Sequence, residues 1–253
     1  MARIAIFDSG LGSLSIIKEI RKVSKNEIIY FADQKNYPYG KKSQAQLHTI
    51  IQKSIKMLKE NFSPDIIVVA SNTPSLMLDL VTQKIIDVKP PLIIAKKISK
   101  SKQIGILATK SAINNKGLSQ YIKKNNFSKL FKIYKINGSN LVDLVESGKF
   151  LSDEKYCKKI IKKDLKILSE SSIDVITLSS THLLFLKPLL KKEFSNIQFV
   201  DPGSIVTQKI YLKIKNKQSK RNSLKIFTSG DVKLFQTKLN KIGIKNKVNF
   251  LEF

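Results

Sequence analysis

Two short apolar runs end in polar side chains that can donate, accept or transfer protons. The runs cover residues 65–70 and 173–178, and both are rich in β-branched residues without polar alternation. Such runs are typical of strands buried on both faces of a parallel sheet. The segments that follow them are Ser71-Asn72-Thr73 and Ser180-Thr181-His182. Because open α/β sheets bind ligands beyond the carboxyl ends of their strands, these two corners are candidates for a functional site.

A third polar corner follows the first expected strand, in the segment Phe7-Asp8-Ser9-Gly10-Leu11-Gly12-Ser13. Its glycines allow a tight turn and the close approach of a ligand. It does not match a phosphate-binding loop, because Ser15 replaces the third glycine, the usual lysine is missing and Asp8 would repel a phosphate. The Asp8 carboxylate is better suited to binding an ammonium group or holding a proton. The structural alternative is a plain turn in which Asp8 or Ser9 caps the next helix.

The second expected strand leads into a loop, residues 33–42, in which Pro38 and Gly40 form a turn signal. Ser43 then has the side chain and the position of a helix cap. Together with the other corners, this loop becomes a candidate for ligand binding. His48 has no comparable context, and we expect it at the surface.

Strand and helix patterns alternate along the chain, which predicts βαβ crossovers and a mostly parallel sheet. The expected strands are residues 4–7, 27–31, 66–69, 92–94, 104–107, 131–135, 175–178, 198–200, 224–228 and 247–251, and the clearest helical patterns are 43–60, 153–170 and 231–241. Breaks in the pattern predict two similar α/β domains, the first made of residues 1–95 plus 208–253 and the second of 96–207. Ser71 and Ser180 would then face each other from different domains across an active-site cleft.

The chain has 253 residues and a net charge of +27, but only three of its 46 basic residues are arginine. Because nucleic-acid recognition favours arginine and the lysines are scattered, we expect a solvated lysine surface and no nucleic-acid partner. The densest basic stretch, 213–220, could be a loop with some polyanion affinity. No apolar stretch reaches about 20 residues and no signal-peptide pattern occurs, which predicts a cytoplasmic protein without a membrane partner. Cys157 is the only cysteine, which excludes disulfide frameworks and cysteine zinc sites, and we interpret it as an incidental helix thiol.

Six motifs, spread over essentially the whole chain, occur in a definite order. They are Asp8-Ser9-Gly10, Tyr30-Phe31-x-Asp33 with Pro38-Tyr39-Gly40-x-Lys42-Ser43, Ser71-Asn72-Thr73, Leu144-Val145-Glu146-x-Gly148, Ser180-Thr181-His182 and Thr228-Ser229-Gly230-Asp231. In this order they resemble the motifs of the glutamate racemase family, within the aspartate/glutamate racemase superfamily. The resemblance implies a two-domain α/β enzyme, usually a homo-oligomer such as a dimer, with its active site between the domains. Such an enzyme interconverts L- and D-glutamate without pyridoxal phosphate or a metal, using one cysteine of each domain as thiolate base and thiol acid.

The resemblance also implies roles for individual residues. Ser71 and Ser180 stand at the positions of the two catalytic cysteines. Asp8 and His182 resemble the residues that assist the two thiols, and Glu146 resembles a further carboxylate near the second thiol. The groups that would hold the substrate, a small amino acid or dicarboxylate, are Asp8, Ser9, Pro38, Tyr39, Gly40, Asn72, Thr73 and Thr181. No cofactor and no metal site are implied.

The two serines change the expected chemistry. Racemisation needs two groups that exchange acid and base roles, and such groups work best with a pKa near the working pH. A cysteine has an ordinary pKa of about 8.5, whereas that of a serine hydroxyl is several units higher, at about 1.4 kcal/mol per unit. We therefore expect racemisation of glutamate, or of a related acidic amino acid, to be impaired unless Asp8 and His182 act as the bases.

Neighbouring positions depart from the family pattern as well. Two family glycines are replaced by Ser13 and Ser179, a Tyr-Pro pair by Leu183-Leu184, and a binding-loop threonine by Ala112. An engineered exchange of two cysteines would not produce these changes, so natural divergence is favoured. In a protein that only binds its ligand, Ala112 and Leu183 would indicate an altered, less polar pocket.

Two other functions remain open. The chain could be a binding protein for an amino acid or dicarboxylate that keeps the cleft without the reaction. It could also be a hydrolase with Ser71 or Ser180 as nucleophile and His182 as base. The short spacing of Ser180 and His182 and the missing G-x-S-x-G elbow count against the hydrolase.

Overall fold

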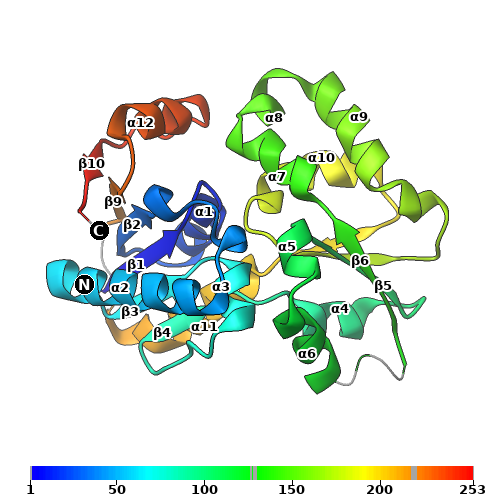
Figure 1. Cartoon of the computed structure of the whole chain (residues 1–253), viewed down its shortest axis with the longest axis horizontal. Coiled ribbons are helices and arrows are strands. Elements are labelled where there is room, and N and C mark those ends of the chain that lie inside the picture. The colour runs from blue at the N-terminus through cyan, green and yellow to red at the C-terminus, as the bar shows by residue number, and fades with distance from the viewer. Residues whose placement is uncertain (1, 126, 128–129, 218–220, 253) are drawn as a thin grey trace. The chain divides into compact units, whose positions relative to one another are not determined.

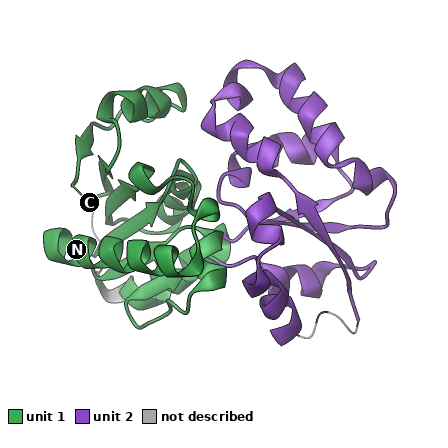
Figure 2. Cartoon of the chain, viewed as in Figure 1, with its two compact units in different colours: residues 1–88, 203–253 green, residues 89–202 purple. Residues whose placement is uncertain are grey.

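The computed structural model describes residues 2–125, 127, 130–217 and 221–252. The chain divides into two compact units, Met1–Val88 with Gly203–Phe253 (unit 1) and Lys89–Pro202 (unit 2) (Figure 2). The chain therefore passes between units a few residues earlier than the boundaries expected from the sequence, after residues 95 and 207. Each unit has its own parallel sheet with helices around it (Figure 1), so the predicted α/β class with mostly parallel sheets is confirmed.

The sheet of unit 1 has the strand order β10-β9-β2-β1-β3-β4, and these neighbours are parallel. Its strands are β1 (Arg3–Asp8), β2 (Glu27–Ala32), β3 (Ile66–Val69), β4 (Ile85–Asp87), β9 (Ser223–Thr228) and β10 (Val248–Phe250). The register pairs Phe7 of β1 with Val69 of β3, and Asp8 of β1 with Ala32 of β2. The residues that follow β1, β2 and β3 therefore meet at one edge of the sheet, its carboxyl edge.

Helices flank the sheet of unit 1. They are α1 (Ser13–Val23), α2 (Gln44–Phe62), α3 (Asn72–Met77), α11 (Gly203–Ile214) and α12 (Val232–Lys241). The helix α2 begins with a capping box formed by Ser43 and Gln46, which confirms the expected cap. Its apolar side packs on alternate residues of β1, β2 and β3, such as Phe7, while α1 packs against α11. Ile4 and Ile6, on the other face of β1, are equally buried, as the unbroken apolar runs predict.

The sheet of unit 2 has the order β6-β5-β7-β8, again with parallel neighbours. Its strands are β5 (Gln103–Ala108), β6 (Lys132–Asn137), β7 (Val175–Leu178) and β8 (Gln198–Val200), and its helices are α4 (Leu92–Ile98), α5 (Lys110–Ile113), α6 (Lys116–Lys124), α7 (Ser139–Glu146), α8 (Lys149–Ser152), α9 (Glu154–Asp164) and α10 (Leu183–Glu193). The core combines Leu107 and Leu178 of the sheet with Leu144, Ile161 and Leu186 of the helices α7, α9 and α10.

One predicted strand is wrong, because residues 92–94 belong to the helix α4. The strand of this region is β4, which pairs with β3. Two prolines precede Leu92, and proline suits the start of a helix because its missing N–H is not needed there. Leu92 and Ala95 are buried whereas Ile93 is 52% exposed, which is the pattern of one helix face.

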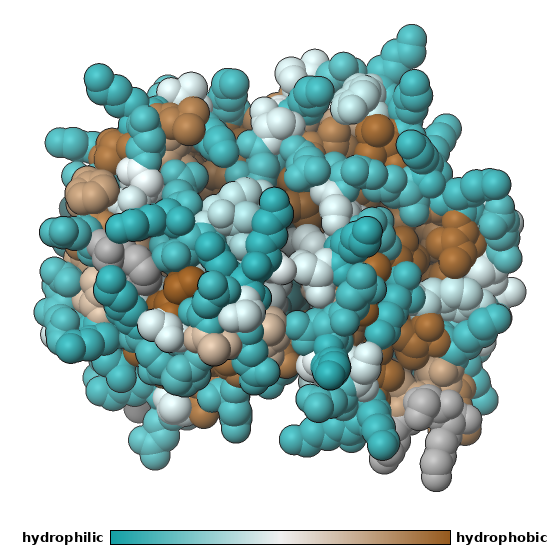
Figure 3. Space-filling view, in the orientation of Figure 1, coloured by the Kyte–Doolittle hydropathy of each residue, from teal (hydrophilic) through white to brown (hydrophobic). Residues whose placement is uncertain are grey.

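Hydrophilic side chains are spread over the visible face of the molecule, with small apolar areas between them (Figure 3). His48 is exposed on α2, as expected. In the basic stretch 213–220, α11 ends at Ile214 and a 3-10 turn covers Lys215–Lys217, so this part is helical rather than a loop. Residues 218–220 lie outside the described residues. In the described part of the chain, no helix has the length and apolar character needed to cross a membrane.

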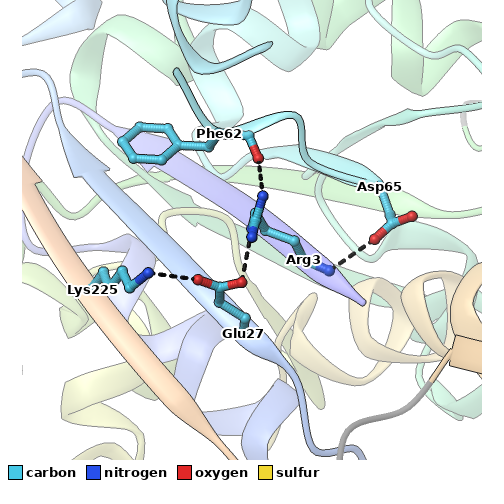
Figure 4. A network of polar contacts seen from close by, with 5 residues as sticks. All are labelled: Arg3, Glu27, Phe62, Asp65 and Lys225. Carbon is cyan, nitrogen blue, oxygen red and sulfur yellow. Dashed lines mark hydrogen bonds and ion pairs between the residues drawn. The ribbon is translucent and has the colours of Figure 1, made fainter. Parts of the chain in front are cut away.

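A network of charged side chains joins the strands at the opposite, amino edge of the unit 1 sheet (Figure 4). Arg3 donates from Nε to Glu27 Oε2 (2.8 Å) and from its guanidinium to the carbonyl of Phe62 (2.5 Å). Glu27 also accepts from Lys225 Nζ (2.8 Å), and the backbone N–H of Arg3 donates to Asp65 (2.9 Å). The hydrogen bonds from Lys225 and Arg3 lower the pKa of Glu27. The network thus fastens β1, β2 and β9 away from the corners.

Candidate active site

The first corner, residues 71–73, follows β3 at the carboxyl edge of the unit 1 sheet. The N–H of Ala70 still bonds to the carbonyl of Phe7 (2.9 Å), so strand pairing continues to the residue before Ser71. Ser71 is the extended, partly buried N-cap of α3. Its carbonyl accepts the hydroxyl of Ser75 (2.7 Å), one turn further along α3. Hydrogen bonds therefore hold the backbone of this corner on both sides of Ser71.

Asn72 has a buried side-chain amide in this corner. The residue is only 5% exposed, and neither Oδ1 nor Nδ2 has a hydrogen-bond partner among the described residues. An unpaired buried polar group costs about 1–3 kcal/mol, so native proteins keep few of them. Because an amide can both donate and accept, Asn72 is suited to the carboxylate or ammonium group of an amino acid. Thr73, the last residue of the corner, is partly exposed.

Asp8 is the last residue of β1 and Ser9 follows it, on the strand next to the first corner. Both residues are buried, and Asp8 Oδ1 accepts the N–H of Ser9 at 2.6 Å. The hydroxyl of Tyr30 donates to the carbonyl of Gly10 (2.5 Å) and holds the turn against β2. The N-cap of α1 is Gly12, so the alternative in which Asp8 or Ser9 caps this helix is wrong. Asp8 lies one residue beyond Phe7, which pairs with Val69 at the end of β3.

Asp33, directly after β2, is a buried carboxylate to which the sequence motifs assign no role. It accepts hydrogen bonds from Tyr39 Oη (2.9 Å), Asn36 Nδ2 (2.9 Å) and Ser229 Oγ (3.0 Å). Burial raises the pKa of Asp33 despite these donors. Its position in the sequence could have indicated a role, because Asp33 comes directly after a buried strand, next to Ala32, the residue that pairs with Asp8.

Tyr39 belongs to the same cluster and is 2% exposed. Burial and the negative charges of Asp33 and Asp8 raise the pKa of Tyr39 well above its ordinary value, so it is a phenol at neutral pH. Its hydroxyl is engaged with Asp33. Pro38 and Gly40 flank it, as the N-cap and the second residue of a 3-10 turn. Asp33 therefore holds the predicted binding loop in place at the carboxyl edge.

The second corner, residues 180–182, follows β7 at the carboxyl edge of the unit 2 sheet. The N–H of Ser179 bonds to the carbonyl of Leu107 (2.8 Å), so Ser180 follows the last strand pairing just as Ser71 does in unit 1. Ser180 and Thr181 are both more than nine-tenths buried. His182 is equally buried and is the N-cap of α10.

His182 and Glu146 are in direct contact at the second corner. Nε2 of His182 lies 2.6 Å from Oε1 of Glu146, the last residue of α7. The two side chains are only 9% and 11% exposed. An ionised carboxylate can only accept, so Nε2 is the donor when Glu146 is ionised, and the carboxylate then also stabilises a protonated ring. The pair can therefore take up and release a proton without a thiol.

Three further positions of unit 2 differ in the polar groups that they offer. Leu183 is wholly buried in the core of unit 2, so it packs against other apolar side chains. Ala112 offers no polar side chain, and its backbone N–H donates to Thr109 Oγ1 (3.3 Å). Ser111 Oγ lies 3.1 Å from the same oxygen and supplies a hydroxyl one position earlier.

Cys157 is not part of either corner. It is buried in the core of unit 2, where burial raises the pKa of its thiol. Among the residues that the structure describes, no group of three or more His, Cys, Asp and Glu side chains is arranged to hold a metal ion.

The predicted site residues thus form two groups, one in each unit. In unit 1, β1, β2, β3 and the loop after β2 bring one group to the carboxyl edge of the sheet, namely Asp8, Ser9, Pro38, Tyr39, Gly40, Ser71, Asn72 and Thr73. In unit 2, the end of β7 and the end of α7 bring together Ser180, Thr181, His182 and Glu146.

Two curated proteins described as glutamate racemases are similar to this chain over most of its length. No family model matches the chain. The glutamate racemase of Buchnera aphidicola subsp. Schizaphis graminum is 34% identical over 239 residues, which cover 87% of this chain and 88% of that protein. The glutamate racemase of Clostridium botulinum (strain Alaska E43 / Type E3) is 30% identical over 238 residues, which cover 89% of this chain and 91% of that protein.

Two solved structures have the same fold. A glutamate racemase isoform of Bacillus anthracis is 23% identical with a TM-score of 0.85, over 100% of this chain and 98% of that one. The glutamate racemase of Francisella tularensis, in complex with D-glutamate, is 23% identical with a TM-score of 0.80, over 99% of this chain and 97% of that one. Since the two curated relatives are 30% and 34% identical along nearly their full length, the chain belongs to the glutamate racemase family.

Proposed function

We propose that the protein is a cofactor-independent racemase that interconverts the L- and D-forms of glutamate, or of a related acidic amino acid, by two-base transfer of the α-proton. The contact of His182 with Glu146 carries this proposal, because it supplies a proton-transfer group two residues from Ser180, where the family pattern has a thiol. An imidazole has an ordinary pKa of about 6.5, so it exchanges acid and base roles near neutral pH far more readily than a serine hydroxyl.

Asp8 is the proposed counterpart in unit 1, because it is a buried carboxylate beside the first corner. One of the two groups removes the α-proton from one face of the amino acid, and the other delivers a proton to the opposite face. Atoms and charge are therefore the same before and after the reaction. Ser71 and Ser180 act as hydrogen-bonding partners. We expect slow turnover, because neither serine replaces a thiolate as a base.

The polar groups of the first corner support an acidic amino acid as the substrate. Asn72 offers a donor and an acceptor that no described residue uses, and Ser9 and Thr73 add two hydroxyls at the same edge of the sheet. The Francisella tularensis relative is in complex with D-glutamate, which makes glutamate the first substrate to test. By resemblance to the family, we also infer a homodimer in the cytoplasm.

The direct test is exchange of the α-proton. The protein is incubated in heavy water with L- and D-glutamate and with L- and D-aspartate, and loss of the α-proton signal is followed by NMR. We expect slow exchange that Asp8→Asn and His182→Asn each abolish. His48→Asn is the matched control, because it removes an exposed histidine of α2 and should leave exchange unchanged. The double variant Ser71→Cys with Ser180→Cys should raise the rate by several orders of magnitude, as the lower thiol pKa predicts.

Each result separates one function from the others. Binding of glutamate without exchange, also in the double cysteine variant, would favour the binding protein and contradict the racemase. Exchange that survives both Asp8→Asn and His182→Asn would contradict the assigned roles. Neither binding nor exchange with any of the four amino acids would overturn the substrate class.

A further inference from the structure

Each corner lies next to a point where the chain passes from one unit to the other. The two crossings lie between Val88 and Lys89 and between Pro202 and Gly203. The first crossing follows β4 and the second follows β8, which are the outer neighbours of the corner strands β3 and β7. A helix begins at each corner, α3 in unit 1 and α10 in unit 2. One side chain of each helix contacts a residue next to the crossing.

In unit 1 this side chain is Ser75 of α3, which is wholly buried. Its hydroxyl donates to the carbonyl of Ser71 (2.7 Å) and accepts the N–H of Val88 (3.1 Å). Val88 is the last residue of unit 1 before the first crossing. Because one hydroxyl makes both bonds, a shift of Val88 pulls on the backbone of Ser71, and neither bond can open without leaving a buried polar group unpaired.

In unit 2 the corresponding side chain is Lys187 of α10. Its Nζ forms an ion pair with Oδ2 of Asp201, which lies two residues before the second crossing. The N-cap of α10 is His182, the residue that contacts Glu146. The ion pair thus connects the second crossing to the helix that positions the imidazole.

We propose that Ser75 and Lys187 are positioning residues that couple the two proton-transfer corners to the two crossings. This inference rests on the proposed function. Neither residue touches the substrate. Each one fixes the backbone of a corner relative to the segment that leaves the unit, so that the corner keeps the geometry that proton transfer requires.

Loosening one corner should change the kinetic isotope effect of racemisation in a way that a loss of stability does not. The equilibrium constant of a racemisation is one, so any variant lowers kcat/KM equally in both directions. If one corner is loosened, however, proton removal by that corner limits the rate more. The isotope effect of α-deuterated substrate then rises in one direction and falls in the other. Ser75→Ala and Lys187→Met act on opposite corners, so their isotope effects must change with opposite signs.

The two variants are made in the background of Ser71→Cys with Ser180→Cys, and racemisation of L- and D-glutamate is followed by circular dichroism. We expect kcat/KM to fall by about tenfold to a hundredfold, with the opposite isotope effects described above. Two matched controls should change neither quantity. Ser24→Ala removes a buried hydroxyl that accepts from Asn26 Nδ2 (2.7 Å) at the other edge of unit 1. Lys192→Met removes an ion pair of α10 with Glu154 (3.3 Å).

Amide hydrogen exchange tests the coupling without any activity. Ser75→Ala should speed exchange together in the segments 70–75 and 86–90, and Lys187→Met in 180–186 and 199–203. If amide exchange in these segments is as slow in the variants as in the parent protein, the coupling is overturned. Faster exchange with unchanged isotope effects overturns the positioning role. Faster exchange without racemisation in any variant means that the proposed function fails while the coupling holds. Lys187 is partly exposed, so its variant decides the question if Ser75→Ala does not fold.

Discussion

Glu146 Oε1 lies 2.6 Å from His182 Nε2, although 36 positions separate the two residues in the chain. The contact exists because α7 ends where α10 begins, on one side of the unit 2 sheet. A carboxylate that accepts from Nε2 fixes the orientation and the tautomer of the ring. The contact therefore engages a defined one of the two ring nitrogens, Nε2.

Glu146→Gln should reduce α-proton exchange by roughly a hundredfold, because the amide neither fixes the tautomer nor stabilises the protonated ring. The exchange rate in heavy water and the ¹⁵N shifts of His182 measure the two effects. Glu154→Gln is the control, since Glu154 lies in the same unit but pairs with Lys158 and Lys192. An unchanged exchange rate in Glu146→Gln, with a racemising parent, would show that Glu146 has no role in proton transfer.

Asn72→Ala should weaken binding of glutamate by about tenfold to a hundredfold, because the bound carboxylate or ammonium group loses its partner. The free protein should not become less stable, since no described residue bonds to this side chain. Titration calorimetry gives the affinity, and denaturant unfolding gives the stability. A loss of stability with unchanged affinity would identify Asn72 as a structural residue.

Tyr39→Phe should cost about 1–3 kcal/mol of stability near pH 7, because it removes a donor from the buried Asp33. Burial raises the pKa of Asp33 above its ordinary 3.8, so its effect on stability is most favourable below that value. It becomes unfavourable as the pH rises through the folded-state pKa. The Tyr39 hydroxyl stabilises the ionised form of Asp33, so without it the stability lost on ionisation is larger. The difference in unfolding free energy between Tyr39→Phe and the parent should therefore shrink in acid, where Asp33 is protonated. Unfolding in urea at about pH 4 and pH 7 measures the difference.

Glu27→Gln should show the opposite dependence on pH. The hydrogen bond from Lys225, with that from Arg3, lowers the pKa of Glu27 below its ordinary 4.5. Its stabilising effect is therefore complete above that value and disappears as the pH falls through the folded-state pKa. We expect a cost of about 1–2 kcal/mol near pH 7 that vanishes in strong acid. Glu60→Gln, at an exposed pair with Lys56, should have almost no effect at either pH.

The corner positions could be predicted from the sequence because each depends on a local pattern. An unbroken apolar run followed by a hydroxyl places Ser71 and Ser180 at the end of a buried strand. The contact of Glu146 with His182 could not be derived in this way, because it depends on how two helices lie on the same sheet. Only the family motifs indicated that Glu146 lies near this corner.

The cluster around Asp33 shows a second limit. Its partner Tyr39 is local, but Ser229 is 196 positions away and reaches Asp33 only because β9 pairs with β2. The error at residues 92–94 has another cause. A run of three apolar residues fits a strand or one turn of a helix equally well, and only the exposure of Ile93 shows which one forms.

The ion pairs of Arg3, Glu27 and Lys225 lie at one end of the strands whose other end carries the polar corners. A strand of six residues such as β1 separates these ends by roughly 17 Å, about two Debye lengths at physiological salt. Exposed charges gained at the amino edge are therefore largely screened from the proton-transfer groups. Lysines can therefore accumulate at that edge, in a chain of net charge +27, while the electric field at Asp8 stays nearly constant.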